Sequence, residues 1–236
     1  MAYLHGAYGE IGESKVASVT QADVVAAYIG TAPVNLIRGY ADKDLVNMPV
    51  KVTNMSEVQS LVGYSDDWET FTLGSAFAEH FDNTVGNVGP IYIVNVLDPA
   101  VHKSAQKTTK ALTFTDGKAE FESDKIILDT FAIADKAVDY ALSYSMAKHT
   151  VTVTLLKETD GAELSATFDT VDTSKVQAAD IIGERTETGE YTGLASMALL
   201  YQYHNVVLNI LAAPGWSHIP AVYKAMVSTI QKLNGH

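Results

Sequence analysis

The sequence lacks cysteine, long apolar runs and clusters of basic residues, and each absence excludes a class of protein. Without cysteine the chain forms no disulfide and offers no thiolate to a metal ion. No apolar stretch reaches the roughly eighteen residues of a membrane-spanning helix. The 16 lysines and arginines are scattered within a chain of net charge -12. Because nucleic acid and anionic membranes both need a concentrated positive face, we expect neither as a partner.

The N-terminal segment lacks the signals of a secreted or phosphate-binding protein. It has no basic stretch followed by an apolar run, so the sequence predicts no signal peptide. Gly6, Gly9 and Gly12 have the wrong spacing for a phosphate loop, and no strand precedes them. We interpret residues 1–21 as an extended arm.

What is present is ample apolar sequence, 47% of 236 residues, enough for a substantial core. Apolar runs bounded by glycine or proline predict buried strands, and a four-residue apolar repeat predicts helices. The expected strands are 24–30, 49–53, 91–96 and 206–212, and the expected helices are 57–62, 72–81, 194–203 and 219–233. This alternation predicts an α/β layer with parallel strands.

The composition shifts between residues 102 and 189, where threonine and aspartate are frequent and apolar residues alternate with polar ones. Asp116-Gly117 and Lys148-His149 each separate two alternating runs, which predicts two hairpins. The predicted fold class is therefore α/β, with the α/β sheet domain split by an inserted antiparallel β-rich module and preceded by the arm. The expected divisions are 1–21 for the arm, 22–101 with 190–236 for the α/β core, and 102–189 for the insert.

No catalytic, cofactor-binding or metal-ligating set follows from the motifs. The histidines at 5, 80, 102, 149, 204, 218 and 236 include no pair at the i, i+4 spacing of a helical metal site. No G-x-S-x-G elbow is present. The run Asp66-Asp67-Trp68-Glu69 is more typical of a solvated helix start than of a carbohydrate platform or a carboxylate pair.

Two functional alternatives remain open. Ligands of open α/β sheets bind where parallel strands end, so Trp216, Ser217 and His218 after the strand 206–212 are candidates for a small-molecule or hydrolytic site. An adhesion module that binds sugars through the insert would instead require an exposed aromatic face between residues 102 and 190.

Several segments, taken in order, resemble the tail sheath proteins of contractile phages and prophages. They are the arm, Val24–Gly30 with Thr31-Ala32-Pro33, the helix start at Ser56-Glu57-Val58, Gly89–Val96, the inserted β module, Thr192-Gly193-Leu194 and Ile210–Gly215, which ends in Ala-Pro-Gly. The resemblance covers most of the chain.

The resemblance implies a structural subunit rather than an enzyme, without cofactor. Its partners would be other copies of itself in head-to-tail helical rings, the tail tube protein and the baseplate, in a virion tail assembled in the host cytoplasm. The arm would link neighbouring subunits through strand addition, with Tyr3, Val16 and Val19 as candidate contacts. Family subunits continue past the point where this sequence stops, so we expect a shortened form that lacks the last strands and a C-terminal arm.

Overall fold

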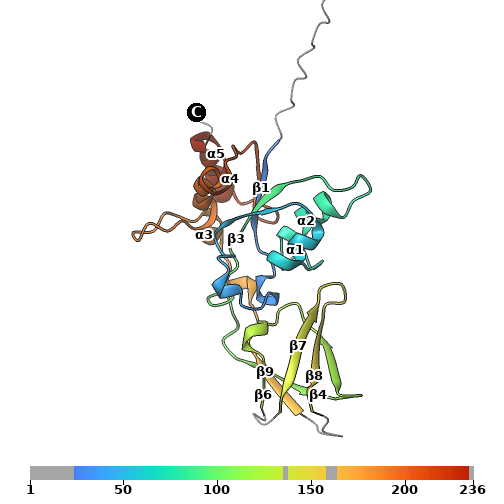
Figure 1. The fold of residues 1–236 in the computed structure, drawn as a ribbon. Coiled ribbons are helices and arrows are strands. Elements are labelled where there is room, and N and C mark those ends of the chain that lie inside the picture. Colours follow the sequence, from blue (N-terminus) through green and yellow to red (C-terminus); the bar gives the residue numbers. More distant parts are fainter. Residues whose placement is uncertain (1–23, 135–137, 158–163, 234–236) are drawn as a thin grey trace, which may run out of the picture.

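A computed structural model describes residues 24–134, 138–157 and 164–233. The predicted arm, 1–21, lies outside these residues. The described chain forms a four-stranded sheet between two helix layers, and a region of two smaller sheets beside it (Figure 1).

The four-stranded sheet has the order β10-β1-β3-β2. Its strands are β1 (Ala26–Gly30), β2 (Pro49–Val52), β3 (Ile91–Asn95) and β10 (Ile210–Ala212). β1 pairs in parallel with both β3 and β10, as the sequence predicts. β2 runs antiparallel to β3, so the expectation of parallel pairing is wrong for this edge strand.

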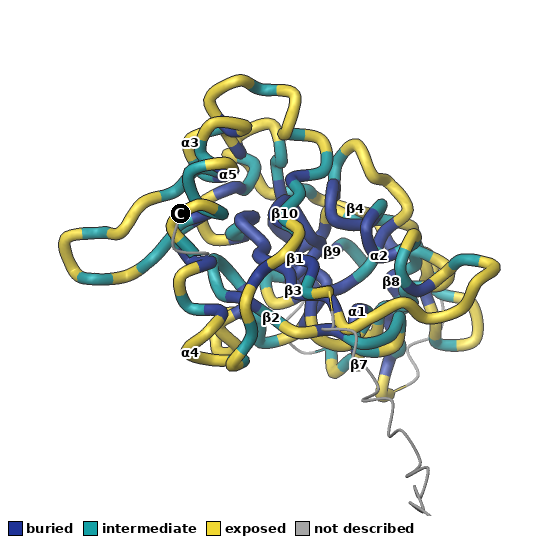
Figure 2. The backbone as a smooth tube through the Cα atoms, turned by 90° about the horizontal axis from the view of Figure 1, so that it is seen from above, coloured by how far each residue is buried: buried dark blue, intermediate teal, exposed yellow. Residues whose placement is uncertain are grey.

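Helices cover both faces of this sheet. One face carries α1 (Met55–Leu61) and α2 (Leu73–Phe81), and the other carries α3 (Ala178–Ile182), the 3-10 helix η5 (Gly193–Leu199), α4 (Leu200–His204) and α5 (Pro220–Leu233) (Figure 1). β1 and β3 therefore run through the buried centre of the molecule (Figure 2). Burial on both faces explains why their sequences are almost continuously apolar.

Local sequence accounts for the first two helices. The Asn54 side chain accepts a hydrogen bond from the backbone N–H of Glu57 at 2.9 Å and caps α1. The Glu57 carboxylate in turn accepts the backbone N–H of Thr53 at 2.8 Å. In α2, Leu73 and Phe77 are fully buried on the face that the four-residue repeat predicts.

The C-terminal part departs from the predicted elements. The expected helix 194–203 begins as the 3-10 helix η5 and only continues as α4. Gly193 has φ of +52° and lies so close to the backbone of Asp180 that a Cβ atom would be 2.5 Å from its carbonyl oxygen. The expected buried strand 206–212 is in fact an edge strand limited to 210–212, in which Ile210 is exposed.

The β-rich region contains two three-stranded antiparallel sheets, β4-β9-β6 and β5-β8-β7. Their strands are β4 (Thr108–Leu112), β5 (Lys118–Glu122), β6 (Ala132–Ile133), β7 (Tyr140–Ser145), β8 (Thr150–Leu155) and β9 (Leu164–Phe168). The hairpin across Lys148-His149 is confirmed by the β7–β8 pairing. The prediction of a hairpin across Asp116-Gly117 is wrong apart from the single bridge between Thr115 and Lys118. The strands on either side belong to different sheets, because β4 pairs with β9 and β5 pairs with β8.

Short 3-10 helices connect these parts: η1 (Val34–Leu36), η2 (Tyr40–Asp42), η3 (Leu128–Thr130) and η4 (Thr173–Lys175). Leu36 of η1 packs into the core of the β-rich region. Val171, Val176 and Ile181 pack with residues of β1 and β3, so the chain has rejoined the core of the four-stranded sheet well before residue 189.

Candidate functional site

At the carboxyl ends of β1 and β3, where open α/β sheets bind ligands, polar side chains hydrogen-bond to neighbouring loops. Thr31, directly after β1, accepts the backbone N–H of Thr72 through its hydroxyl at 2.9 Å. The buried side chain of Asn95, at the end of β3, accepts the N–H groups of Ala32 and Leu97 at 2.9 and 3.0 Å. These polar groups hold the strand ends to neighbouring loops and are not directed at a ligand.

The candidate residues Trp216, Ser217 and His218 do not form a cleft. Trp216 is partly buried against the cluster below α5, while Ser217 and His218 are exposed. All three are absent from the lining of five surface cavities in the described part of the chain. The backbone of this turn supports the fold: the N–H groups of Trp216 and Ser217 both donate to the carbonyl of Ala213.

A cavity of 560 Å³ lies beyond β3, and Asp98, His102 and Asp180 are among its lining residues. Each of these groups has a structural partner. The backbone N–H of Asp98 donates to Nδ1 of His102 at 3.0 Å, and the Asp98 carboxylate accepts the N–H of Ala100 at 2.8 Å. The Asp180 carboxylate accepts the N–H of Gln177 at 2.6 Å at the start of α3. The arrangement stabilises two loop ends.

The aromatic side chains of the β-rich region point inward. Phe168 stacks on Phe121 and Phe131 with centroid separations of 5.6 and 6.1 Å, and Phe131 and Phe168 are buried. Among the described residues between 102 and 190, the exposed large apolar side chain is Leu156, and no aromatic one is exposed. The exposed aromatic face that sugar binding would require is absent from this part of the structure.

The run 66–69 lies in a turn before α2 and not in the helix itself. The Asp67 carboxylate accepts the backbone N–H of Thr70 at 3.2 Å, as expected for a polar turn. Trp68 is half exposed, and its ring packs directly on Gly74. A Cβ atom at position 74 would be 2.7 Å from Cδ1 of Trp68. This ring covers the start of α2.

Exposed large apolar side chains are frequent in the C-terminal elements α4, β10 and α5 of the described chain. Six large apolar side chains of these elements and the loop between them are exposed by 40% to 65%: Tyr201, Tyr203, Val207, Ile210, Tyr223 and Val227. We call this set the apolar rim. β10 also forms one border of the four-stranded sheet, because it pairs only with β1 among the described strands. Ile210 lies at this open edge, which is typical of a protein interface, whereas α4 contacts β2 at the opposite border of the sheet.

The apolar rim does not follow from the sequence patterns. Residues 206–212 are predicted as a buried strand and 219–233 as a helix, and Val207 and Val227 are exposed. The position of Tyr223 could have indicated an exposed apolar face on α5. Val222 and Met226 are four residues apart and pack inward, and Tyr223 falls outside that repeat. The candidate arm residues Tyr3, Val16 and Val19 lie outside the described residues.

In the described ranges, no helix combines the length and the apolar character that crossing a membrane requires.

No protein-family model matches this chain. The chain is 30% identical over 228 residues to the tail sheath protein of Burkholderia phage BcepMu. The alignment covers 91% of this chain and 43% of that relative, so the chain spans less than half of the relative's length.

Proposed function

We propose that this chain, whose resemblance to phage tail sheath proteins is confirmed by its similarity to a named tail sheath protein, is a non-enzymatic structural subunit of a contractile tail. In this proposal copies of the chain polymerise in head-to-tail rings around the tail tube. Contraction of the rings drives the tube through the host envelope. The subunits would assemble in the host cytoplasm and remain in the tail of the virion, in contact with the tube protein and the baseplate.

The observation that carries the proposal is the extent of the similarity, which runs through 91% of the chain and so includes both the four-stranded sheet and the β-rich region. The described structure is compatible with a structural role. At the strand ends where an α/β enzyme would bind its ligand, the side chains of Thr31 and Asn95 are bonded to backbone N–H groups of the protein itself. The apolar rim supplies a surface for another copy.

Subunit linkage would use the arm. Tyr3, Val16 and Val19 remain our candidates for residues that add a strand to a neighbour's open sheet edge. Backbone hydrogen bonds of this kind persist while side-chain interfaces rearrange, so a linked lattice can undergo large rigid-body movements without breaking. A head-to-tail contact of this type propagates into a helix.

We also retain, as part of the proposal, the division into an α/β core and an inserted β-rich domain. Supporting it, strands β4 to β9 share a core of their own that includes Phe131, Val153 and Phe168. The packing of Val171 and Val176 with the α/β core favours a return point soon after β9.

The direct test is electron microscopy of this chain co-expressed with the tail tube protein from the same genome. Striated cylinders around a tube are expected. Ile210→Lys places a charge in the apolar rim at the open edge and should abolish the cylinders, whereas Leu156→Lys, at an exposed apolar site in the β-rich region, should not. Particles that never exceed single subunits with wild-type chain and tube would contradict the proposal.

Assembly should also respond to salt. The net charge of -12 makes copies repel one another unless local charges are complementary. Because salt screens exposed charges over roughly 10 Å at 0.1 M, cylinder formation should change between low and high ionic strength. Sedimentation of assembled material across a salt series measures this.

A further inference from the structure

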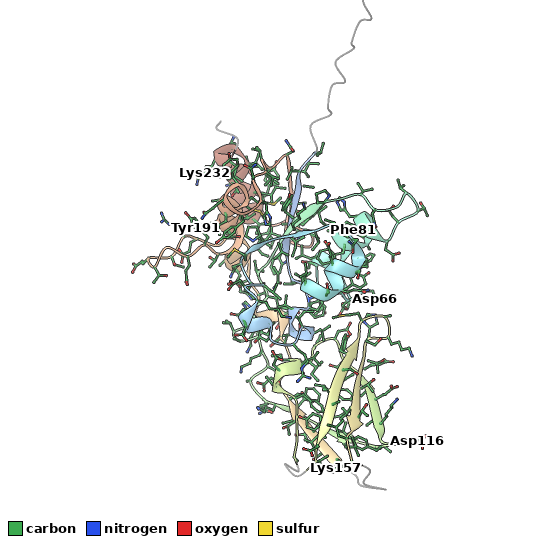
Figure 3. The ribbon with its side chains drawn as sticks, viewed as in Figure 1. Asp66, Phe81, Asp116, Lys157, Tyr191 and Lys232 are labelled. Carbon is green, nitrogen blue, oxygen red and sulfur yellow. The ribbon has the colours of Figure 1, made fainter. Side chains whose placement is uncertain are left out.

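Three metal-ligating side chains from separate segments converge where the helices α1 and α2 meet the β-rich region. Asp66 lies in the loop between α1 and α2, Asp124 follows β5, and His149 lies in the turn between β7 and β8. Each offers a ligand atom within 4.8 Å of the others. Figure 3 labels Asp66 at this junction, next to the end of the β7–β8 hairpin.

The Asp124 carboxylate orients the imidazole ring. Nδ1 of His149 lies 3.0 and 3.1 Å from the two carboxylate oxygens. The hydroxyls of Ser65 and Tyr144 donate to the same carboxylate, one to each oxygen. Because an ionised carboxylate only accepts hydrogen bonds, Nδ1 carries the proton and donates it to Asp124.

The opposite ring nitrogen then faces a second carboxylate. With its proton on Nδ1, the neutral ring has a lone pair on Nε2, which lies 3.5 Å from Oδ1 of Asp66. Two acceptors that face each other repel unless a proton or a metal cation lies between them. The separation exceeds the usual 2.7–3.2 Å of an N–H···O hydrogen bond. Two ligands bound to one zinc ion by bonds of about 2.1 Å at a tetrahedral angle are about 3.4 Å apart.

We propose that Nε2 of His149 and the Asp66 carboxylate bind one divalent transition-metal ion of the Zn²⁺ class, with Asp124 holding the imidazole from behind. A carboxylate on the far nitrogen of a ligating histidine fixes the ring and makes it a better donor to the metal. Imidazole favours zinc and its neighbours over magnesium or calcium. Water completes the coordination, because the Asp66 side chain is 72% exposed and the site opens to solvent.

The bound ion would join the two parts of the molecule. Asp66 belongs to the loop that precedes α2, and His149 belongs to the β7–β8 hairpin of the β-rich region. Asp124 already connects them, since it accepts from Ser65 on one side and from Tyr144 on the other. The metal adds a second connection across the same junction. This inference does not depend on the proposed role of the chain in a phage tail.

Calorimetric titration of the purified chain with ZnCl2, together with the visible absorption spectrum after CoCl2 addition, tests the proposal. Binding of one ion per chain and a cobalt spectrum with a nitrogen ligand are expected. Asp66→Asn and His149→Asn should abolish this binding. Asn is chosen at position 149 because the backbone there has φ of +51°, which asparagine tolerates. Asp124→Asn, which removes the outer carboxylate, should weaken the affinity about 10- to 100-fold.

His218→Gln is the matched control, because His218 is exposed and remote from the cluster in sequence, and it should bind zinc as the wild type does. Asp66→Asn is a surface change that leaves the fold intact, so its result is interpretable even if His149→Asn unfolds. Failure of the wild type to bind one equivalent of zinc, or unchanged binding by Asp66→Asn, would overturn the proposal.

Discussion

The four-stranded sheet and the β-rich region use different ways of burying a strand. β3 is buried along all of its residues because helices cover both of its faces. β8 alternates between buried and partly exposed residues because only one of its faces is packed. The first arrangement fixes the strand through two independent cores, and the second depends on one aromatic core between two small sheets.

This difference predicts which part of the structure a core substitution destabilises. A cavity on one face of the four-stranded sheet lies in one of its two cores, whereas a cavity in the β-rich region lies in the single core that all of its strands share. Both tryptophans, Trp68 and Trp216, lie outside the strands β4 to β9. Tryptophan fluorescence therefore reports on the α/β part alone and allows the two regions to be followed separately.

The largest effect is expected for Phe77→Ala, which removes a fully buried ring between α2 and the sheet. Loss of a buried phenylalanine side chain lowers the free energy of unfolding by about 3–5 kcal/mol. Urea denaturation followed by tryptophan fluorescence measures it. Val85→Ala, at a side chain that is 86% exposed, serves as the control and should change stability by less than about 0.5 kcal/mol. A similar small loss in both variants would contradict the proposed core.

Phe168→Ala removes the central ring of the aromatic stack and should lower the stability of the β-rich region by about 3 kcal/mol. Circular dichroism, which reports on all strands, should show an early transition. The fluorescence transition of the two tryptophans should stay where it is in the wild type. Coincident shifts of both signals would mean that the two regions unfold as one unit, against the proposed inserted domain.

Asn35→Ala tests the link between the regions. The buried Asn35 amide donates to the carbonyls of Asp124 and Ile126, at 2.8 Å each. Removing it leaves two buried acceptors without these donors, at a cost of about 1–3 kcal/mol. Unlike Phe168→Ala, this change should shift both transitions. The exposed Gln231→Ala in α5 is its control, and an Asn35→Ala protein as stable as that control would refute the role.

A smaller and purely local effect is expected at the start of α1. Asn54→Ala removes the acceptor for the N–H of Glu57 and should cost about 1 kcal/mol. Asn54→Asp keeps an acceptor in place and should retain nearly all of the stability. Chemical denaturation of the two variants side by side distinguishes capping from a general loss, since equal destabilisation would argue against the cap.

The smallest effect concerns alkaline pH. Burial raises the pKa of Tyr28, whose hydroxyl lies 2.6 Å from Nε2 of His80. The folded state thus favours the neutral phenol, a contribution that is complete below about pH 10 and is lost as the pH rises further. Tyr28→Phe should make the decline in stability above about pH 10 less steep than in the wild type. A slope in Tyr28→Phe identical to that of the wild type would reject the assignment.

Local sequence predicts the elements of this fold better than their partners. The apolar runs of β1 and β3, the α2 repeat and the Asn54 cap each follow from residues within one segment. The pairing of β4 with β9 does not, because Asp116-Gly117 allows a tight turn without specifying that the strands on either side stay together. Val206 to Leu208 are apolar without forming a strand, since only Leu208 is buried there.

The candidate sites also differ in how far local sequence predicts them. The loop 213–215 and the residues after it follow a predicted strand, so their position is readable from the sequence, although the cleft expected there is absent from the described structure. The group of Asp66, Asp124 and His149 has sequence separations of 58 and 25 residues, and no spacing rule connects them. Only the meeting of three loops in the folded chain brings them together.

The pairing of β1 with β10 has a consequence for synthesis. Ala26 is matched with Ile210, so β1, the first described strand of the sheet, receives its second neighbour 184 residues later. At roughly 5–20 residues per second, a ribosome needs about 10–40 s to deliver that neighbour. During this interval one side of β1 is free on the nascent chain, and a strand from an adjacent ribosome on the same message can occupy it. Slow translation, or closely spaced ribosomes on one message, should therefore increase the fraction of chains that pair wrongly through β1. A chaperone bound to the nascent chain should decrease that fraction.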